Sequence, residues 1–183
     1  MCKQCEKKPV YEFTNQRKLC ANCFIRYFQK KVLYTIRKFG MIRSGDVVGF
    51  KNGTGLKDVV LEDVLNMFAE KGHVGVVKFP NKKTTKLALP DTTDSVAGEI
   101  VHEVVGGEVS AHPPTQKRGN LPILIRPLYL FLDKEVLLYA KLRGLKFVKK
   151  EEKKDKLGKF IDELEKKHPE LKRAVVNGML NID

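Results

Sequence analysis

All four cysteines of this chain lie within its first 23 residues, in two C-x-x-C pairs. Fourteen residues separate the pair C-K-Q-C from the pair C-A-N-C. This arrangement is typical of a closed zinc site, in which each pair forms a tight turn and four thiolates surround one tetrahedral ion. We therefore predict a structural Zn²⁺ site and no thiol for chemistry elsewhere. Its ligands are Cys2, Cys5, Cys20 and Cys23.

Two disulfides in a secreted protein, or four free thiols, are the alternatives to a metal site. We expect no signal peptide before Cys2 and no apolar run long enough to span a membrane. A reducing, cytoplasmic location is therefore expected, and there paired C-x-x-C motifs are more often metal sites than disulfides. Between the pairs, Pro9, Val10, Tyr11 and Phe13 predict a short hairpin of the zinc-ribbon type.

The chain is strongly basic, with a net charge of +13 over 183 residues. Such a charge attracts phosphate backbones or anionic surfaces. Solvated lysines that only keep a protein soluble explain the charge equally well. The 42% hydrophobic content allows one sizeable core beside the ribbon.

A basic amphipathic helix is predicted over 24–39, because apolar residues recur there at helical spacing and Gly40 follows. We predict that its basic side binds an RNA backbone, although a plain solvated face is nearly as good an interpretation. A second basic site is predicted in a proline-rich loop over 111–121. The residues predicted to bind RNA are Arg26, Lys30, Lys31, Arg37 and Lys38 on the helix, and Lys117 and Arg118 in the loop.

The remaining segments alternate between strands and helices, which predicts an α/β fold with a parallel sheet. We expect four regions: a zinc ribbon at 1–24, a basic linking helix at 25–40, an α/β domain at 41–150 and C-terminal helices at 151–183. The expected strands are 47–50, 74–79, 86–89 and 121–127, and the expected helices are 56–71, 94–105, 133–143, 155–167 and 169–180.

Few other side chains suggest chemistry. The four histidines are scattered and predict no ligand set. The run from Asp91 to Asp94 is best explained as a helix N-terminal cap. Arg126 is either buried against a carboxylate or in contact with a partner, and the sequence leaves both open.

A glycine-rich turn at 51–55 joins the first predicted strand to a helix, where a phosphate commonly binds. Glycine alone is a weak signal, because any tight turn uses it. However, the order of segments and several motifs resemble the cytoplasmic tRNA 2-thiolation proteins of the PP-loop superfamily. The motifs are C-K-Q-C…C-A-N-C-F, I-R-P-L at 125–128, D-K-E-V at 133–136 with Tyr139 following, and F-I-D-E-L-E-K-K-H-P-E-L-K near the C-terminus.

The resemblance extends over most of the chain and implies a reduced Rossmann-like domain, of the adenine-nucleotide alpha-hydrolase-like type. Catalytic members carry S-G-G-x-D-S at the turn and a second element resembling G-H-N-x-D-D. Here these read T-G-L-K-D-V at 54–59 and P-D-T-T-D-S at 90–95. The core cysteines of the family's iron–sulfur or sulfur-transfer chemistry are missing, and the domain is short. We therefore predict a pseudo-enzyme without catalytic or cofactor-binding residues, its turn degenerate at Thr54, Gly55, Lys57 and Asp58.

The resemblance implies a non-catalytic subunit of a complex that 2-thiolates the wobble uridine of tRNA. The implied partners are a catalytic thiouridylase subunit in a heterodimer, tRNA, and a ubiquitin-like sulfur carrier, with no membrane involved. Two alternatives remain. One is an active ATP-dependent PP-loop enzyme with unusual residues at the turn, and the other is a free-standing zinc-ribbon protein that binds RNA.

Overall fold

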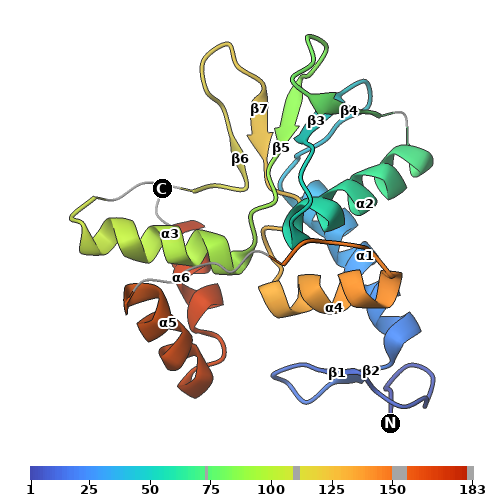
Figure 1. The fold of residues 1–183 in the computed structure, drawn as a ribbon, viewed down its shortest axis with the longest axis vertical. Helices are drawn as coiled ribbons and strands as arrows, with labels where there is room; N and C mark the ends of the chain where they lie inside the picture. Colours follow the sequence, from blue (N-terminus) through green and yellow to red (C-terminus); the bar gives the residue numbers. More distant parts are fainter. Residues whose placement is uncertain (73, 109–111, 150–155, 181–183) are drawn as a thin grey trace.

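A computed structural model describes residues 1–72, 74–108, 112–149 and 156–180. The N-terminal ribbon consists of β1 (Tyr11–Glu12) and β2 (Lys18–Leu19), which pair antiparallel with Tyr11 opposite Leu19. This confirms the predicted hairpin between the two cysteine pairs. The ribbon lies at one end of the molecule, beside the N-terminus (Figure 1).

A five-stranded sheet forms the centre of the α/β body, in the order β4-β3-β5-β7-β6. Four strands run parallel and β6 pairs antiparallel with β7, which confirms the predicted α/β fold with a mainly parallel sheet. The strand β6 lies where we predicted only a loop, and that prediction was wrong. The strands are β3 (Val47–Lys51), β4 (Gly75–Phe79), β5 (Lys86–Ala88), β6 (Thr115–Gln116) and β7 (Ile123–Ile125).

Each predicted helix is found, with its described ends within three residues of the prediction. The first helix begins earlier than its apolar pattern, because Cys20 caps it and the second cysteine knuckle continues into its first turn. The predicted boundary at 150/151 and the predicted helix start at residue 155 lie outside the described residues. The helices are α1 (Ala21–Lys38), α2 (Leu56–Lys71), α3 (Thr93–Val105), α4 (Asp133–Arg143), α5 (Lys156–Lys167) and α6 (Leu171–Leu180).

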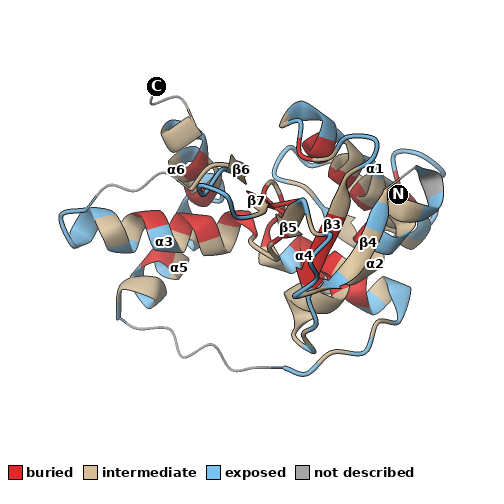
Figure 2. Ribbon diagram, turned by 90° about the horizontal axis from the view of Figure 1, so that it is seen from above, coloured by how far each residue is buried: buried red, intermediate tan, exposed pale blue. Residues whose placement is uncertain are grey.

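The helices form two groups on opposite sides of the strands, α1, α2 and α4 on one side and α3, α5 and α6 on the other (Figures 1 and 2). The larger hydrophobic core lies in the first group and includes ribbon residues. Phe28 of α1 stacks on Tyr139 of α4, with 4.1 Å between the ring centroids. Apolar burial of this kind is the main source of folded stability, so α1 fixes the ribbon to the body.

The smaller core joins α3 to α6. Val96, Ala97 and Ile100 of α3 are buried against Val176 of α6, together with Tyr129. The C-terminal helices therefore pack against α3, on the side of the strands opposite α2 (Figure 2). No helix in the described part of the chain is long and apolar enough to cross a bilayer.

The strand order changes direction between β3 and β5. The chain passes from β3 through α2 to β4 on one side, whereas β5 pairs with the opposite edge of β3. Ligands of open α/β sheets bind in the crevice at the carboxyl ends of strands where the order reverses. Here that crevice, which we call the switch-point crevice, is bordered by the turns that follow Lys51 and Ala88.

Candidate functional site

The four cysteines converge at the start of the chain, as their spacing predicts. Their sulfur atoms all lie within 4.8 Å of one another, and Cys5 Sγ is 3.7 Å from Cys2, 3.3 Å from Cys20 and 3.5 Å from Cys23. Four thiolates at 2.3 Å from one tetrahedral Zn²⁺ are about 3.8 Å apart. The donor set therefore fits a single metal ion.

The ionisation of the thiols supports a bound cation. Burial opposes ionisation of Cys2, but backbone N–H groups, including that of Gln4, outweigh it and lower the pKa of Cys2 to about 6. The pKa of Cys23 is raised to about 12, because its thiol faces the sulfur of Cys5 and is buried. Four negative sulfurs so close together repel one another, so the full set ionises only around a cation.

The outer side of α1 carries the predicted RNA-binding residues. Arg26, Lys30, Arg37 and Lys38 are exposed, and α1 contains no acidic residue. Lys31 differs, since only 16% of its side chain is exposed and its Nζ lies 3.3 Å from Glu135 Oε2. Desolvation lowers the pKa of Lys31, although Glu135 opposes this. The structure thus separates one buried pair from four solvent-facing cations.

A hollow of about 620 Å³ lies between α1 and the first cysteine knuckle. We call it the α1 hollow. The sequence analysis identified only three of its six lining residues. Tyr34 could have been identified as well, because it lies four residues, about one helical turn, after Lys30 and therefore on the same side of α1. The lining residues are Gln4, Arg26, Tyr27, Lys30, Lys31 and Tyr34.

Lys117 and Arg118 are exposed just after β6. Lys117 lines a second hollow, of about 370 Å³, together with Arg43, Lys86 and the residues Phe39 and Gly40 that end α1. The loop cation and the basic helix, predicted as separate sites, therefore meet at the C-terminal end of α1.

The turn at 52–55 lies in the switch-point crevice, between β3 and the N-terminus of α2. Lys57 Nζ is 3.2 Å from Asp133 Oδ2 and 3.3 Å from Ser95 Oγ. These residues come from the first turns of α2, α3 and α4, so three helix N-termini meet here. Burial is the largest influence on Asp133 and raises its pKa, while Lys57 acts in the opposite direction.

Asp58 occupies the inner side of this turn. A Cβ at Gly53 would lie 2.2 Å from Asp58 Oδ2 and 2.8 Å from Asp58 Cβ, so the turn needs glycine at this position. A Cβ at Gly55 would lie 2.9 Å from Asp58 Oδ2 alone, and a shift of that carboxylate would make room for it. The turn is also tied to the segment after α4, because Val148 N–H donates to the carbonyl of Thr54 at 2.8 Å. A phosphate bound here meets the Asp58 carboxylate and therefore requires a cation with it.

The segment 91–94 caps the N-terminus of α3, as predicted, and also forms an ion pair with Arg126. Thr92 is the N-cap of α3 and exchanges hydrogen bonds with Ser95. Asp91 instead pairs with Arg126, whose Nε donates to Asp91 Oδ2 at 2.8 Å. Arg126 is 4% exposed, which confirms the first of the two alternatives for this residue, burial against a carboxylate.

Two clusters of charged residues were missed by the sequence analysis. His112 lies between Glu99 and Glu103, at 3.2 Å and 2.9 Å. Lys172 of α6 lies within ion-pair distance of Asp94, Asp162 and Glu165. Only the Lys172 cluster had a readable signal, since Lys172 is one turn before Val176 on the buried face of α6. Both clusters join segments that are separate in the sequence.

Comparison with known proteins gives a match by structure. No protein-family model matches the chain, and no curated protein matches it. The structure is similar to that of the U34-tRNA thiolase NcsA from Methanococcus maripaludis, described with its [4Fe–4S] cluster, with a TM-score of 0.80. The match covers 100% of this chain and 88% of that one, at 18% sequence identity. The chain therefore has the fold of this thiolase.

This comparison contradicts our prediction that the chain is a pseudo-enzyme and not an enzyme. The similar protein is described as a thiolase, and the chain has its fold from end to end, so the domain is not the shortened one that we inferred. The prediction relied on residue identities at 54–59 and 90–95. In the structure, the first of these segments still forms a strand-to-helix turn, with β3 ending at Lys51 and α2 beginning at Leu56.

Proposed function

We propose that this chain is an ATP-dependent PP-loop enzyme that takes part in the thiolation of tRNA at U34. The observation that carries the proposal is the end-to-end similarity of its fold to that of a U34-tRNA thiolase. Two features of the chain support it. An open basic surface on α1 suits an RNA backbone, and the switch-point crevice lies where α/β sheets bind ligands.

In this proposal the switch-point crevice binds ATP with Mg²⁺, and Lys57 contacts a phosphate. The O2 atom of the uridine attacks the α-phosphate and pyrophosphate leaves. A sulfide equivalent then adds at C2, and AMP leaves with the original oxygen. The chain's four thiols all lie in the metal site, so the sulfur comes from a separate donor, for which we propose a ubiquitin-like sulfur carrier.

The metal ion is proposed to be Zn²⁺ in a structural role. The sulfur separations fit one tetrahedral ion, and four protein thiolates leave no coordination position open for water or substrate. Metal analysis of the purified chain is expected to give one zinc per chain. Iron together with acid-labile sulfide would contradict the assignment.

The proposal is tested in cells that lack the gene. Mass spectrometry of their tRNA is expected to show loss of 2-thiouridine, restored by the wild-type gene and not by a Lys57→Ala variant. Normal 2-thiouridine in the deletion strain would overturn the thiolation role. Pulling down the chain from its host additionally tests association with a second thiolase subunit, which the family resemblance implies.

The enzymatic step is tested with the purified chain. ATP binding is expected to require Mg²⁺, because Asp58 faces the turn, and incubation with tRNA and ATP is expected to release pyrophosphate. No ATP binding with Mg²⁺ present, and no pyrophosphate release, would contradict the enzymatic part. An RNA-binding protein without this chemistry, the remaining alternative, would give that result while still binding tRNA.

A further inference from the structure

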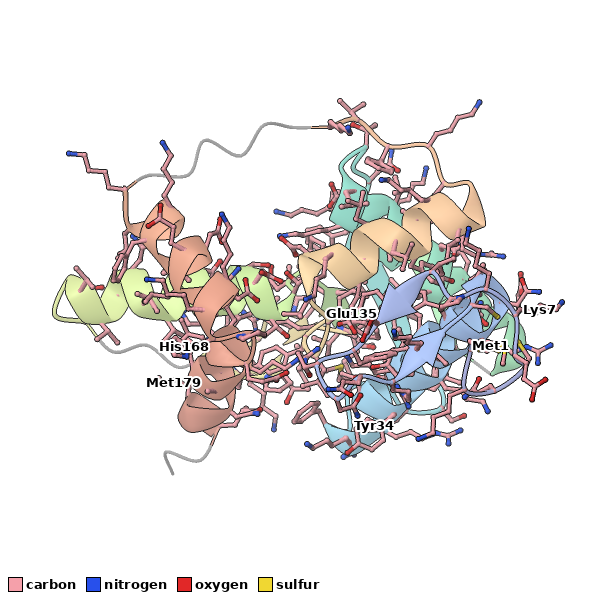
Figure 3. All side chains as sticks on the ribbon, turned by 90° about the horizontal axis from the view of Figure 1, so that it is seen from below. Met1, Lys7, Tyr34, Glu135, His168 and Met179 are labelled. Carbon is pink, nitrogen blue, oxygen red and sulfur yellow. The ribbon has the colours of Figure 1, made fainter. Side chains whose placement is uncertain are left out.

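One face of α1 presents an aromatic ring among cations. Arg26, Lys30, Tyr34 and Arg37 follow one another at intervals of three or four residues, so they lie along the same side of the helix. All four are exposed. Tyr34 has 56% of its surface exposed, which is unusual for a large aromatic residue. Figure 3 shows it at the periphery of the molecule.

The cations on this face are available to a ligand. Among the described residues, neither Arg26 nor Lys30 takes part in an ion pair. Lys31 is held by Glu135, which lies in the interior (Figure 3). The two exposed cations therefore carry their full charge toward the α1 hollow, and anions are attracted to it.

The two tyrosines of the α1 hollow differ in how their rings are used. The ring of Tyr27 has cations close to it already, with the guanidinium of Arg17 5.0 Å and the ammonium of Lys31 5.7 Å from its centroid. Burial raises the pKa of Tyr27 to about 12, as expected for a side chain packed against the protein. Tyr34 stands out in solvent, with Lys38 Nζ 6.0 Å from its centroid. Its ring is the accessible stacking surface.

The shape of the α1 hollow suits one nucleotide and not a duplex. Its volume of about 620 Å³ is in the range of small-ligand sites. Paired bases turn only their edges outward, whereas the unpaired bases of single-stranded RNA stack on aromatic side chains. The hollow also contains Gln4, an amide that can both donate to and accept from the edge of a base.

We propose that the α1 hollow binds a single unpaired nucleotide of RNA. The base stacks on Tyr34, the flanking phosphates contact Arg26 and Lys30, and the amide of Gln4 hydrogen-bonds the base edge. This inference rests on the proposed function for the identity of the RNA as tRNA, whose loops offer unpaired bases. It goes beyond that function by assigning the recognition of an unstacked base to the ribbon and α1.

The test uses the full chain and a short single-stranded RNA that contains the fluorescent base 2-aminopurine. Replacing Tyr34→Ala is expected to weaken binding roughly tenfold and to abolish the fluorescence quenching, since one base loses its stacking partner. Tyr34→Phe keeps the ring and is expected to stay within about twofold of wild type. Phe160→Ala is the matched control, because Phe160 is similarly exposed, at 54%, on another lysine-rich helix.

Salt titration separates stacking from charge. Arg26→Ala or Lys30→Ala is expected to reduce the salt dependence of binding, whereas Tyr34→Ala leaves it unchanged. All these side chains are exposed, and thermal melting verifies that each variant is folded. Equal binding by Tyr34→Ala and wild type, or equally tight binding of a duplex of the same sequence, would overturn the inference.

The outcome is independent of the thiolation assay. If cells lacking the gene lose 2-thiouridine but Tyr34→Ala binds single-stranded RNA normally, the nucleotide site is wrong and the proposed function stands. If 2-thiouridine is normal but binding depends on Tyr34, the nucleotide site is supported and the thiolation role is wrong.

Discussion

The outer face of α1 and the switch-point crevice both contain lysines, but they use them differently. Lys30 is exposed and forms no ion pair with any carboxylate of the described residues, whereas Lys57 contacts both Asp133 and Ser95. Unpaired surface cations attract any phosphate backbone, and this attraction is weakened by salt. In the crevice, a ligand has to replace contacts that the protein already makes, so only a ligand with matching groups binds there. We therefore expect α1 to attract nucleic acids of any sequence, and the switch-point crevice to be selective for its ligand.

The largest expected effect concerns the metal site, which lies at the start of α1. Cys20→Ser is expected to release the metal and to unfold the ribbon, because a structural zinc site contributes on the order of 10 kcal/mol to folding. Metal analysis together with limited proteolysis of the first ~25 residues measures this. Treatment of the wild-type chain with a chelator should have the same effect. An ordered ribbon without metal would contradict this prediction and would show that the aromatic contacts of α1 are enough to keep the ribbon folded.

Neighbouring lysines on α1 give the sharpest contrast between free and paired charge. Lys31→Ala leaves the fully buried Glu135 without its nearest cation, so we expect the free energy of unfolding to fall by about 3 kcal/mol. Lys30→Ala should change it by less than about 0.5 kcal/mol. Urea denaturation measures both.

The same pair tests the RNA role of α1. The double charge reversal Lys30→Glu and Lys31→Glu is expected to weaken tRNA binding and to flatten its salt dependence. Lys30→Glu alone should account for most of the loss, because Lys31 is engaged with Glu135. Unchanged tRNA affinity across a salt titration would remove α1 from the RNA-binding surface.

In the crevice, Lys57→Ala is expected to weaken binding of Mg²⁺-ATP by about 2 kcal/mol, the contribution of a hydrogen bond to a charged group. The matched control is Lys141→Ala, since Lys141 is exposed in the last turn of α4, at the opposite end of that helix from Asp133. Calorimetric titration of both variants gives the difference. Similar losses in the two would show that ATP is attracted by net charge and not by the crevice.

The smallest expected effect is the pH dependence of metal binding. Between the pKa of Cys2, about 6, and that of Cys23, about 12, the metal-free site keeps at least one proton that metal binding must displace. The affinity is therefore expected to rise with pH, by at least about tenfold per unit, or 1.4 kcal/mol. Competition with a chelator at pH 7 and pH 8 measures it. A flat profile would mean that all four thiols are ionised before the metal binds.

The sequence predicts what short-range patterns determine. The cysteine spacing locates the metal site, and glycines mark helix ends, as at Gly144, whose φ of 67° lies in the region that favours glycine. The sequence does not predict β6, because a strand of two residues is too short to show an alternation of apolar and polar side chains. Nor does it predict how His112 and Lys172 pair, since their carboxylate partners lie on other elements and local spacing does not show which ones meet.

In the candidate site, too, the sequence predicts what one element contains and not how separate elements meet. The cations of α1 are readable because one helix displays them all. The meeting of Lys57, Ser95 and Asp133 requires three helix N-termini to converge, which only the folded sheet order brings about. The prediction of a pseudo-enzyme failed for a related reason, because it inferred the state of a turn from residue identities alone.

Glu135 connects three helices of the molecule, α1, α4 and α6. It accepts a hydrogen bond from the N–H of Leu132 at the start of α4, and its Oε2 lies 3.3 Å from Lys31 on α1 and 3.7 Å from Arg173 on α6. A nucleic acid that draws the ammonium of Lys31 toward itself competes with this carboxylate. If α1 binds RNA as proposed, thermodynamic reciprocity requires that a change weakening the contact between Lys31 and Glu135 favours RNA binding, and that RNA binding weakens this contact in return.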